Sequence, residues 1–298
     1  MTAHTLGGTL TIGGRGVPRI GYGMGSLHRS AEAADGHQDA IGVLEAAYDL
    51  GVRMFDTAHF YGDGLANQLI REALGTHRDE LLIASKVGAR STPEGPFPMA
   101  AAQKPSELRD SVEINLRTLE TDRLDLVYMR RMDAQPGLIA DGDQQVPLED
   151  QLSELLALRE EGKILGIGLS HVSLEQLRTA YGHGAEVQAV QNIYGLIDRH
   201  DQALLDLCAE QGTAWIPYFP LGGGFHNAPR VADDGTVQRI AAANGLTASQ
   251  VGQAWLLHCA PNTALISGTS QIAHLKENVA AGDVQLSDEE WSELDTLG

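Results

Sequence analysis

Residues 124–171 read LDLVYMRRMDAQPGLIADGDQQVPLEDQLSELLALREEGKILGIGLSH, and this stretch decides the fold. The apolar runs Leu124–Met129 and Ile164–Leu169 have the length and composition of strands that are buried on both faces. Between them leucines recur at helical spacing, at Leu148, Leu152, Leu155 and Leu156. The stretch therefore predicts a strand, a helix with one apolar face, and a second strand parallel to the first.

The same alternation of short apolar runs and amphipathic segments continues along the chain. Six further runs have strand character: Ile20–Gly23, Val52–Phe55, Leu81–Ser85, Val187–Val190, Ala214–Phe219 and Thr263–Ile266. Capping boxes mark three helix starts, at Ser173–Gln176, Thr247–Gln250 and Ser287–Glu290. Eight such units predict an α/β fold, a closed (β/α)8 TIM barrel in which residues 1–298 form a single domain.

An open doubly wound sheet is the alternative to a barrel. Its dinucleotide fingerprint, GxGxxG, would join the first strand directly to a helix. Here Gly21, Gly23 and Gly25 give GxGxG, and the first convincing helical pattern begins only near His37. Because the fingerprint fails, the barrel is the better prediction.

Two further features are expected at the ends of this barrel. Residues Thr5–Ile12, around a pair of glycines, are typical of a β-hairpin and are predicted to cap the barrel floor. The long irregular segments 90–104, 133–146 and 222–234 follow predicted strands. We expect them as βα loops over the C-terminal face, where the active sites of such barrels lie.

Composition excludes several classes of partner. The 298 residues include 21 basic and 40 acidic side chains, a formal net charge of −19. This balance opposes sequence-independent binding to nucleic acid or to anionic lipid. The first residues show no signal-peptide pattern, no apolar run approaches the roughly 18 residues that span a bilayer, and the histidines lack metal-ligand spacing. We expect a cytoplasmic protein without a metal site.

Polar and aromatic residues gather where the predicted strands end. They are Asp56, Lys86, Arg130, Ser170, His171, Gln191, Asn192, Tyr218, Phe219 and Ser267–Ser270. An Asp or a Lys taken singly at such a position is as often part of a salt bridge at the barrel rim as it is catalytic. Because the C-terminal ends of parallel strands share one rim, together they predict a ring of functional groups around the barrel mouth.

Two motifs resemble the signature of the aldo-keto reductase family: FDTAHFYG at residues 55–62 and ASKVG at residues 84–88. The loops LGG at 221–223, SGTS at 267–270 and HLKEN at 274–278 resemble the cofactor loops of that family. The resemblance covers nearly the whole chain. It implies a (β/α)8 barrel that binds NADP(H) in an extended form.

The resemblance also implies a catalytic tetrad of Asp, Tyr, Lys and His. Three of these map onto Asp56, Tyr61 and Lys86, but Arg130 stands where most members carry the His. This departure resembles the bacterial pyridoxal reductase branch of the family. It puts the role of the fourth residue in doubt.

The remaining three residues suit the reduction of a carbonyl group. Hydride transfer leaves negative charge on the carbonyl oxygen, so an acid must supply a proton, and Tyr61 is the candidate. A free phenol titrates near 10, and a neighbouring ammonium lowers that pKa, which is the role expected for Lys86. Asp56 is expected to pair with Lys86 and to fix its direction.

Arg130 leaves two interpretations open. A guanidinium has no acceptor, so it can polarise the carbonyl oxygen or receive an anionic substrate group, such as the phenolic oxygen of pyridoxal. Alternatively, Arg130 points aside into a structural ion pair, and Arg131 or water serves the pocket.

The cofactor-binding residues that the resemblance implies are Gly23, Met24, Ser170, His171, Gln191, Tyr218, Phe219, Pro220, Leu221, Gly222, Ser267, Gly268, Thr269, Ser270, His274, Glu277 and Asn278. The partners of the nicotinamide carboxamide would be Ser170, Gln191 and either Asn192 or His171. Either Tyr218 or Phe219 would stack on the nicotinamide ring.

The turn Gly268–Ser270 opens a predicted helix, whose free N–H groups suit the 2′-phosphate. No Arg stands in the turn, so positive charge would have to come from His274 or Lys276, and the preference for NADPH over NADH stays open. Glu277 and Asn278 would meet the adenine.

The sequence therefore predicts an NADPH-dependent reductase of a small aldehyde, with pyridoxal as the leading substrate and a monomer or weak homo-oligomer as the assembly. An aromatic substrate pocket is expected from Tyr22, His59, Phe60, Met132, Tyr194 and Phe225. The alternatives are a reductase of a ketone or imine in secondary metabolism and a catalytically weak NADP(H)-binding regulatory protein. A Schiff-base lyase that uses Lys86 is disfavoured, because Tyr61 and Asp56 favour a charged amine.

Overall fold

The computed structural model describes residues 5–33, 36–95, 98–224 and 228–298. Within these residues eight parallel strands form a sheet in the order β10-β9-β8-β7-β5-β4-β3-β11. Their bounds are β3 Ile20–Gly23, β4 Met54–Asp56, β5 Leu82–Ser91, β7 Leu126–Arg130, β8 Ile167–Ser170, β9 Val187–Gln191, β10 Ala214–Trp215 and β11 Leu265–Ile266. The sheet closes where Trp215 N–H donates to Asn262 O at 2.8 Å and Ala264 N–H donates to Trp215 O at 2.9 Å. The predicted barrel is confirmed.

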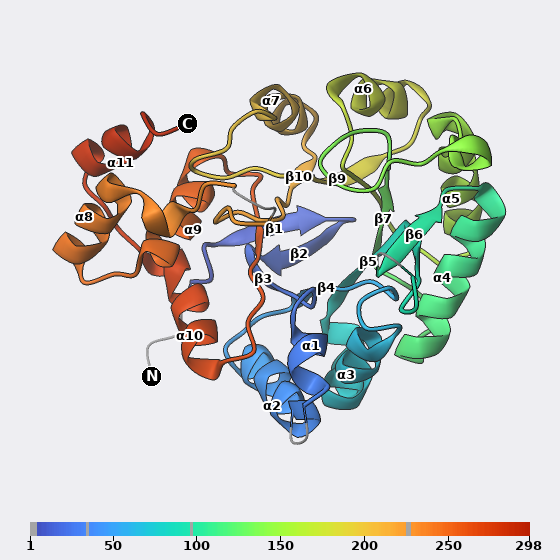
Figure 1. Cartoon of the computed structure of the whole chain (residues 1–298), viewed down its shortest axis with the longest axis horizontal. Helices are drawn as coiled ribbons and strands as arrows, with labels where there is room; N and C mark the ends of the chain where they lie inside the picture. The colour runs from blue at the N-terminus through green and yellow to red at the C-terminus, as the bar shows by residue number, and fades with distance from the viewer. Residues whose placement is uncertain (1–4, 34–35, 96–97, 225–227) are drawn as a thin grey trace.

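Helices surround this barrel (Figure 1). Their bounds are α1 Leu27–Ala31, α2 Gly36–Asp49, α3 Leu65–Leu74, α4 Pro105–Leu119, α5 Leu148–Glu160, α6 Leu174–Gly182, α7 Gln202–Gln211, α8 Gly235–Asn244, α9 Ala248–Cys259, α10 Ile272–Ala280 and α11 Asp288–Leu294. Spacings of three and four place the apolar residues of each longer helix against the sheet, as Leu108, Val112 and Leu116 of α4 show. All three predicted capping boxes are present, at the starts of α6, α9 and α11.

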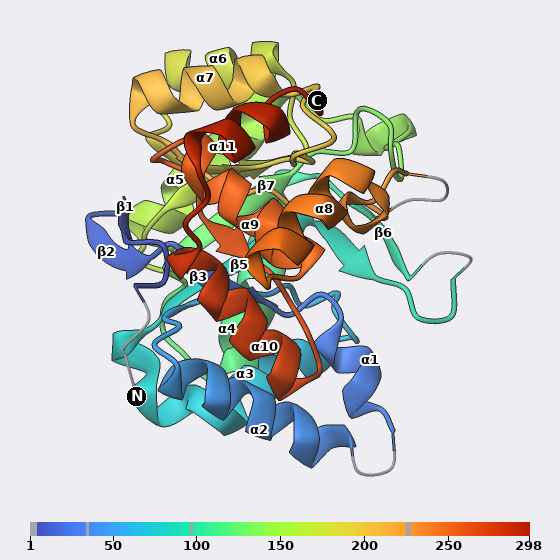
Figure 2. The ribbon, with the colours of Figure 1, turned by 90° about the vertical axis from the view of Figure 1, so that its left-hand side faces the viewer.

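A two-stranded hairpin, β1 Thr9–Ile12 and β2 Arg15–Pro18, covers the N-terminal ends of the barrel strands. Ile12 and Val17 pack into the barrel interior with residues such as Leu82 and Leu126. Figure 2 shows the hairpin and strand β6 (Met99–Ala102) at opposite ends of the molecule. The hairpin therefore forms the floor, as expected, and the mouth lies at the other end.

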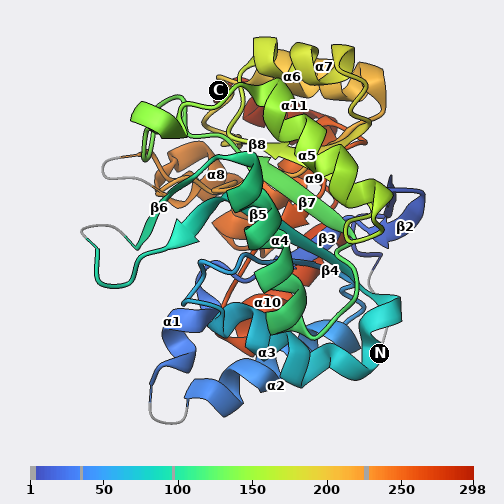
Figure 3. The same cartoon turned by 90° about the vertical axis from the view of Figure 1, so that its right-hand side faces the viewer.

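Three local predictions were wrong. The hairpin turn falls at Gly13–Gly14, both with positive φ, and not within Thr5–Ile12. Residues 90–104 are not irregular throughout, because the end of β5 pairs with β6 as an antiparallel ribbon that projects from the barrel (Figure 3). The short helix α1 precedes the first helix that the sequence indicated.

An ion-pair cluster ties the floor hairpin to the barrel wall. The buried Asp125 carboxylate accepts the Ile83 N–H at 2.8 Å and pairs with Arg78 Nη2 at 2.8 Å and with Arg15 Nη1 at 3.6 Å. Arg15 Nη1 also donates to Leu81 O at 2.7 Å. Each charged group of this cluster is thus paired with another element of the fold.

Over the described ranges, no helix combines the length and the apolar character needed to cross a membrane.

Candidate active site

The predicted catalytic residues lie together at the mouth. Asp56 ends β4 and Arg130 ends β7, while Lys86 lies inside β5 and not at its end, because β5 continues into the ribbon with β6. Tyr61 follows β4 in the turn before α3. Three residues from neighbouring strands and one from the turn after β4 therefore lie at one rim, as the barrel geometry requires.

Asp56 and Lys86 form a buried ion pair. Lys86 Nζ donates to Asp56 Oδ1 and, at 3.2 Å, to Thr57 O. The second carboxylate oxygen of Asp56 accepts from Gln191 Nε2 at 2.9 Å. Burial alone lowers the pKa of Lys86, but the Asp56 carboxylate and the Tyr61 side chain outweigh it, so the pKa is raised and the amine stays an ammonium.

The phenol of Tyr61 lies beside this ammonium. Lys86 Nζ is 5.1 Å from the centroid of the Tyr61 ring, and Tyr61 is one of the groups that raise the pKa of Lys86. Two further rings flank Tyr61: Phe60 meets it edge-on at 5.1 Å between centroids, and His28 lies parallel to it at 6.2 Å. Tyr61 is thus held at the mouth by a charge and by ring contacts.

Arg130 and Arg131 differ sharply although they are neighbours in sequence. Arg131 Nε pairs with Asp133 Oδ2 at 2.7 Å, and its Nη1 donates to Val146 O at 2.9 Å and to Gln151 Oε1. Among the described residues, Arg130 forms no ion pair, and its buried Nε has no hydrogen-bond partner. The structural ion pair that the sequence left open for Arg130 is therefore made by Arg131.

Two serine hydroxyls at the mouth are also buried without a partner among the residues that the structure describes: Ser170 Oγ at the end of β8 and Ser267 Oγ after β11. Beside Ser267, the backbones of Gly23 and Gly268 approach so closely that a Cβ on either would collide with backbone atoms opposite. Buried hydroxyls without partners destabilise a fold unless a ligand or water satisfies them. The donor set therefore fits a polar cofactor that extends from β8 to the turn after β11.

His171 and Asn192 were the alternatives for the nicotinamide carboxamide, and the structure engages both elsewhere. His171 Nε2–H donates to Ala134 O at 2.9 Å, so its Nδ1 accepts from the Tyr218 hydroxyl at 2.9 Å. The Asn192 amide bonds both backbone groups of Val172 and donates to Asp201. These contacts join the strand ends to one another.

The two predicted stacking rings differ in environment. Burial raises the pKa of Tyr218 to about 12, so its hydroxyl stays protonated and donates to His171. The Phe219 ring is 42% exposed and meets Tyr218 edge-on at 5.3 Å, with its backbone at a positive φ. Pro220 and Leu221 follow in the same turn, which the Gly222 N–H closes on Phe219 O at 2.9 Å.

Met24 does not present its side chain to the mouth. The side chain is fully buried in the core beneath α1, and its N–H donates to Asp56 O at 2.8 Å. A side-chain role in binding a cofactor therefore does not fit Met24, which instead supports the strand that carries Asp56.

The predicted phosphate turn lies at the start of α10. The helix N-cap, Gln271, makes no side-chain cap, and the Thr269 hydroxyl accepts the Gln271 N–H at 3.1 Å. Ser270 is exposed, as are His274 and Lys276, whereas Glu277 and Asn278 are half-buried. The N-terminal end of α10 is thus open to an anion.

One polar residue near this turn was not foreseen. Gln253 on α9 donates Nε2 to Asn278 Oδ1 at 2.8 Å, and its buried Oε1 has no partner. Its neighbours in the sequence of α9 are mostly apolar, so the sequence gives no sign of a functional role. The unpaired amide oxygen in the structure is what draws attention to Gln253.

The expected aromatic substrate pocket is largely core. Tyr22 and Tyr194 are fully buried, with the Tyr22 hydroxyl bonded to Thr269 O and the Tyr194 ring packed against Trp215. Met132 is buried too, whereas His59 and Phe60 lie in the turn before Tyr61. Phe225 lies outside the described residues.

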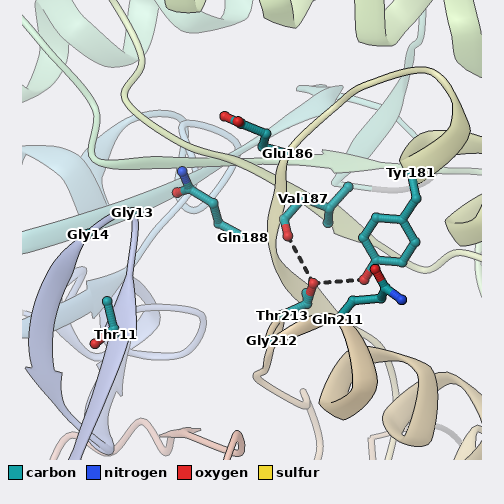
Figure 4. Close-up of a pocket in the computed structure, with 10 residues that line it drawn as sticks. All are labelled: Thr11, Gly13, Gly14, Tyr181, Glu186, Val187, Gln188, Gln211, Gly212 and Thr213. Atoms are coloured by element: carbon teal, nitrogen blue, oxygen red, sulfur yellow. Dashed lines mark hydrogen bonds between the residues drawn. The ribbon is translucent and has the colours of Figure 1, made fainter.

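A cavity of about 510 Å³ opens at the opposite end of the barrel, between the floor hairpin and the start of β10. Figure 4 shows the Gln188 amide directed toward Gly13 and Gly14, and Thr213 bonded to Tyr181 across from them. None of the predicted site residues lines it, so it is separate from the mouth.

The comparisons with known proteins agree with this geometry. The sequence profile of the Aldo/keto reductase family matches residues 19–298. The chain belongs to this family. The predicted family and the predicted class of enzyme, an oxidoreductase, are therefore confirmed.

Relatives of this aldo/keto reductase cover nearly its whole length. Pyridoxine 4-dehydrogenase of Escherichia coli (strain K12) is 40% identical over 292 residues, 97% of this chain and 98% of the relative. An uncharacterized oxidoreductase of Schizosaccharomyces pombe is 32% identical over 294 residues, 98% of this chain and 90% of the relative. The Escherichia coli relative confirms the predicted likeness to the pyridoxal reductase branch.

Solved structures share the fold of this aldo/keto reductase. An aldo-keto reductase from Klebsiella pneumoniae, solved in complex with NADPH, superposes with a TM-score of 0.80 at 27% identity, covering 97% of this chain and 94% of that structure. Another structure of an aldo/keto reductase from Klebsiella pneumoniae, in complex with NADP and acetate, gives a TM-score of 0.79 at 28% identity with the same coverage.

Proposed function

We propose that this aldo/keto reductase uses NADPH to reduce a small aldehyde, with pyridoxal as the leading substrate and pyridoxine as its product. The observation that carries the proposal is the array at the mouth, in which Tyr61 lies beside a buried ammonium and Arg130 is left without a partner. The 40% identity to pyridoxine 4-dehydrogenase supports the choice of substrate.

NADPH would supply a hydride to the carbonyl carbon. Tyr61 would give its hydroxyl proton to the carbonyl oxygen, so that an alcohol is formed and the phenolate left behind takes a proton from solvent. The Lys86 ammonium stabilises that phenolate by its charge. Asp56 keeps Lys86 charged and directed, because the two groups are buried together.

Arg130 would select the substrate. Its guanidinium is permanently charged and planar, and no group of the described chain neutralises it. Pyridoxal carries a phenolic oxygen next to its aldehyde, so one cationic donor can contact the phenolic oxygen and the carbonyl oxygen together. A neutral imidazole at this position would lack the permanent charge.

The residues present also suit the cofactor. Ser170 and Ser267 offer hydroxyls that have no partner in the described ranges. The backbones at Gly23 and Gly268 lie so close to the chain opposite that neither position has room for a Cβ. The open N-terminal end of α10 suits the 2′-phosphate, with Lys276 nearby in sequence as a source of positive charge. We expect NADPH to bind better than NADH for this reason.

The test measures turnover of a panel of aldehydes that differ by one oxygen. The rate is read from the loss of NADPH absorbance. We expect turnover of pyridoxal, and a preference for salicylaldehyde over benzaldehyde of about tenfold in kcat/KM, the size of one charge-assisted hydrogen bond. Arg130→Met should abolish that preference and still reduce benzaldehyde.

Two results would contradict the proposal. Equal rates for salicylaldehyde and benzaldehyde in the unmodified enzyme would remove Arg130 from substrate selection and favour a different carbonyl or imine substrate. NADPH binding without oxidation by any carbonyl would favour the regulatory protein that binds NADP(H).

A further inference from the structure

The orientation of Tyr61 depends on a residue that lies outside the predicted tetrad. Lys86 contacts the phenol as a charge, and Phe60 touches it only edge-on. The imidazole of His28 lies parallel to the Tyr61 ring within 6°, with the two centroids 6.2 Å apart. Among the described residues, His28 is the one that presents a parallel ring to this phenol.

The local structure directs His28 toward Tyr61. Leu27 and Ala31 of α1 are both buried in the core, four residues apart, so they anchor the short helix by one face. His28 follows Leu27 and is thereby fixed at the mouth, half-buried, and not free on the surface.

The residue after Tyr61 leaves room for this stack. Gly62 has a φ of +63°, and a Cβ built on it would lie 3.0 to 3.1 Å from Cβ, Cδ2 and Cγ of His28. A larger residue would therefore be strained and would press on the imidazole. The turn that carries Tyr61 and the helix that carries His28 are fitted to each other at this point.

We propose that His28 is a positioning residue that holds the Tyr61 phenol, by parallel stacking, in the orientation from which it gives its proton to the carbonyl oxygen. The inference rests on the proposed function, because it assigns to Tyr61 the role of acid. Arg130 stands at the position of the tetrad His and has no ring, so it cannot stack on Tyr61 in the way that His28 does.

The charge state of His28 agrees with a stacking role. Burial lowers the pKa of His28, and the neighbouring Arg29 lowers it further, while Glu32 and a backbone carbonyl oppose the shift. The net pKa lies below the ordinary value of 6.5, so the ring at neutral pH is an uncharged imidazole. The stack therefore adds no charge beside Tyr61 and Lys86.

The test compares His28→Ala, which removes the ring, with His28→Phe, which keeps a flat ring and removes the nitrogens. We expect His28→Ala to lower kcat by about tenfold, because small misplacements of a catalytic group cost one or two orders of magnitude. Its Kd for NADPH should stay within about twofold, as should kcat in the matched control Ser30→Ala on the same helix. His28→Phe should recover kcat to within about threefold of the unmodified enzyme.

A second readout does not depend on activity. In protein labelled with ¹³C on the tyrosine rings, the Tyr61 signal is assigned by its absence in Tyr61→Phe. It should shift and broaden in His28→Ala and stay close to its original position in His28→Phe. This measurement distinguishes failure of the His28 proposal from failure of the proposed reductase activity, because it reports on Tyr61 even if no carbonyl is reduced.

The proposal is overturned if His28→Ala keeps full kcat, or if His28→Phe is as slow as His28→Ala. It is also overturned if the Tyr61 signal is unchanged when the imidazole is removed.

Discussion

The floor and the mouth of this barrel both contain buried polar groups, and the two regions differ in the partners that the protein supplies to Asp125 and to Arg130. At the floor, Asp125 is bonded by two arginines and a backbone N–H, and each donor joins a different segment of the fold. At the mouth, Arg130 Nε, Ser170 Oγ and Ser267 Oγ are buried and find no partner within the described part of the chain. Since an unpaired buried polar group destabilises the protein, our proposal assigns these three atoms to a bound ligand.

Arg130 and Arg131 show the same contrast between neighbours. Arg131 turns outward to Asp133 and Gln151 and joins the loop after β7 to α5. Arg130 Nε is buried without a partner, and among the described residues the Arg130 side chain makes no ion pair. Alternation of side chains along a strand accounts for the opposite directions, and the partners account for the different roles.

The largest expected effect removes the proton donor from the mouth. Tyr61→Phe should lower kcat by at least about 100-fold, the usual contribution of a general acid, and leave NADPH affinity and stability nearly unchanged. Steady-state rates and a fluorescence titration with NADPH measure the two quantities. Turnover at the original rate would remove Tyr61 from the chemistry.

A second change removes the central carboxylate of the ion-pair cluster at the floor. Asp125→Ala leaves Arg78 and Arg15 without their shared carboxylate, so the free energy of unfolding should fall by about 3 kcal/mol, while kcat stays unchanged. Urea unfolding gives the value, and a single transition would also support the predicted single domain. The control Asp79→Ala, which removes an exposed carboxylate paired with Arg123, should leave stability nearly unchanged. Equal effects of the two changes would refute the structural role of the floor cluster.

The adjacent arginines provide the sharpest pair of variants. Arg131→Met should lower the free energy of unfolding by about 2 kcal/mol, because buried hydrogen-bond acceptors lose their donor. Arg130→Met should leave stability unchanged or slightly higher and should raise the KM for pyridoxal about tenfold. If Arg130→Met were instead the destabilising change, the contrast between the two residues would be lost.

The smallest expected effect is on stability in mild acid. The pKa of His28 is lowered in the fold, first by burial, so the unfolded chain binds a proton more readily than the folded protein below pH 6.5. Stability from this residue is therefore complete above pH 6.5 and is lost as the pH falls through the lowered pKa. His28→Phe should make the decline of Tm between pH 6.5 and pH 5 shallower by about one degree. A steeper decline in the variant would contradict the sign.

The sequence predicted the barrel because its eight strands are buried on both faces and its helices carry regular apolar spacings. Capping boxes at Ser173, Thr247 and Ser287 depend only on residues three apart, and all three were predicted. The ribbon with β6 was missed because its residues, MAAA, lack strand-forming side chains and are ordered by pairing with β5.

The sequence predicted which residues lie near the ends of the strands, but it did not predict which partners their side chains contact. A side chain at a strand end reaches the mouth by geometry, and this placed Asp56 and Arg130 correctly. Lys86 pairs with Asp56 as expected but lies inside β5, because β5 continues into the ribbon with β6. The partners of a side chain depend on loops from distant strands, so the engagement of His171 by Ala134 and Tyr218 was not visible in sequence. The catalytic and cofactor roles themselves stay predictions.

The most direct test of the central claim is a crystal structure of the complex with NADPH. The account predicts that the dinucleotide lies across the mouth, with Ser170 Oγ and Ser267 Oγ bonded to it and the nicotinamide facing Tyr61. A dinucleotide bound elsewhere, with both hydroxyls still unpaired, would contradict it.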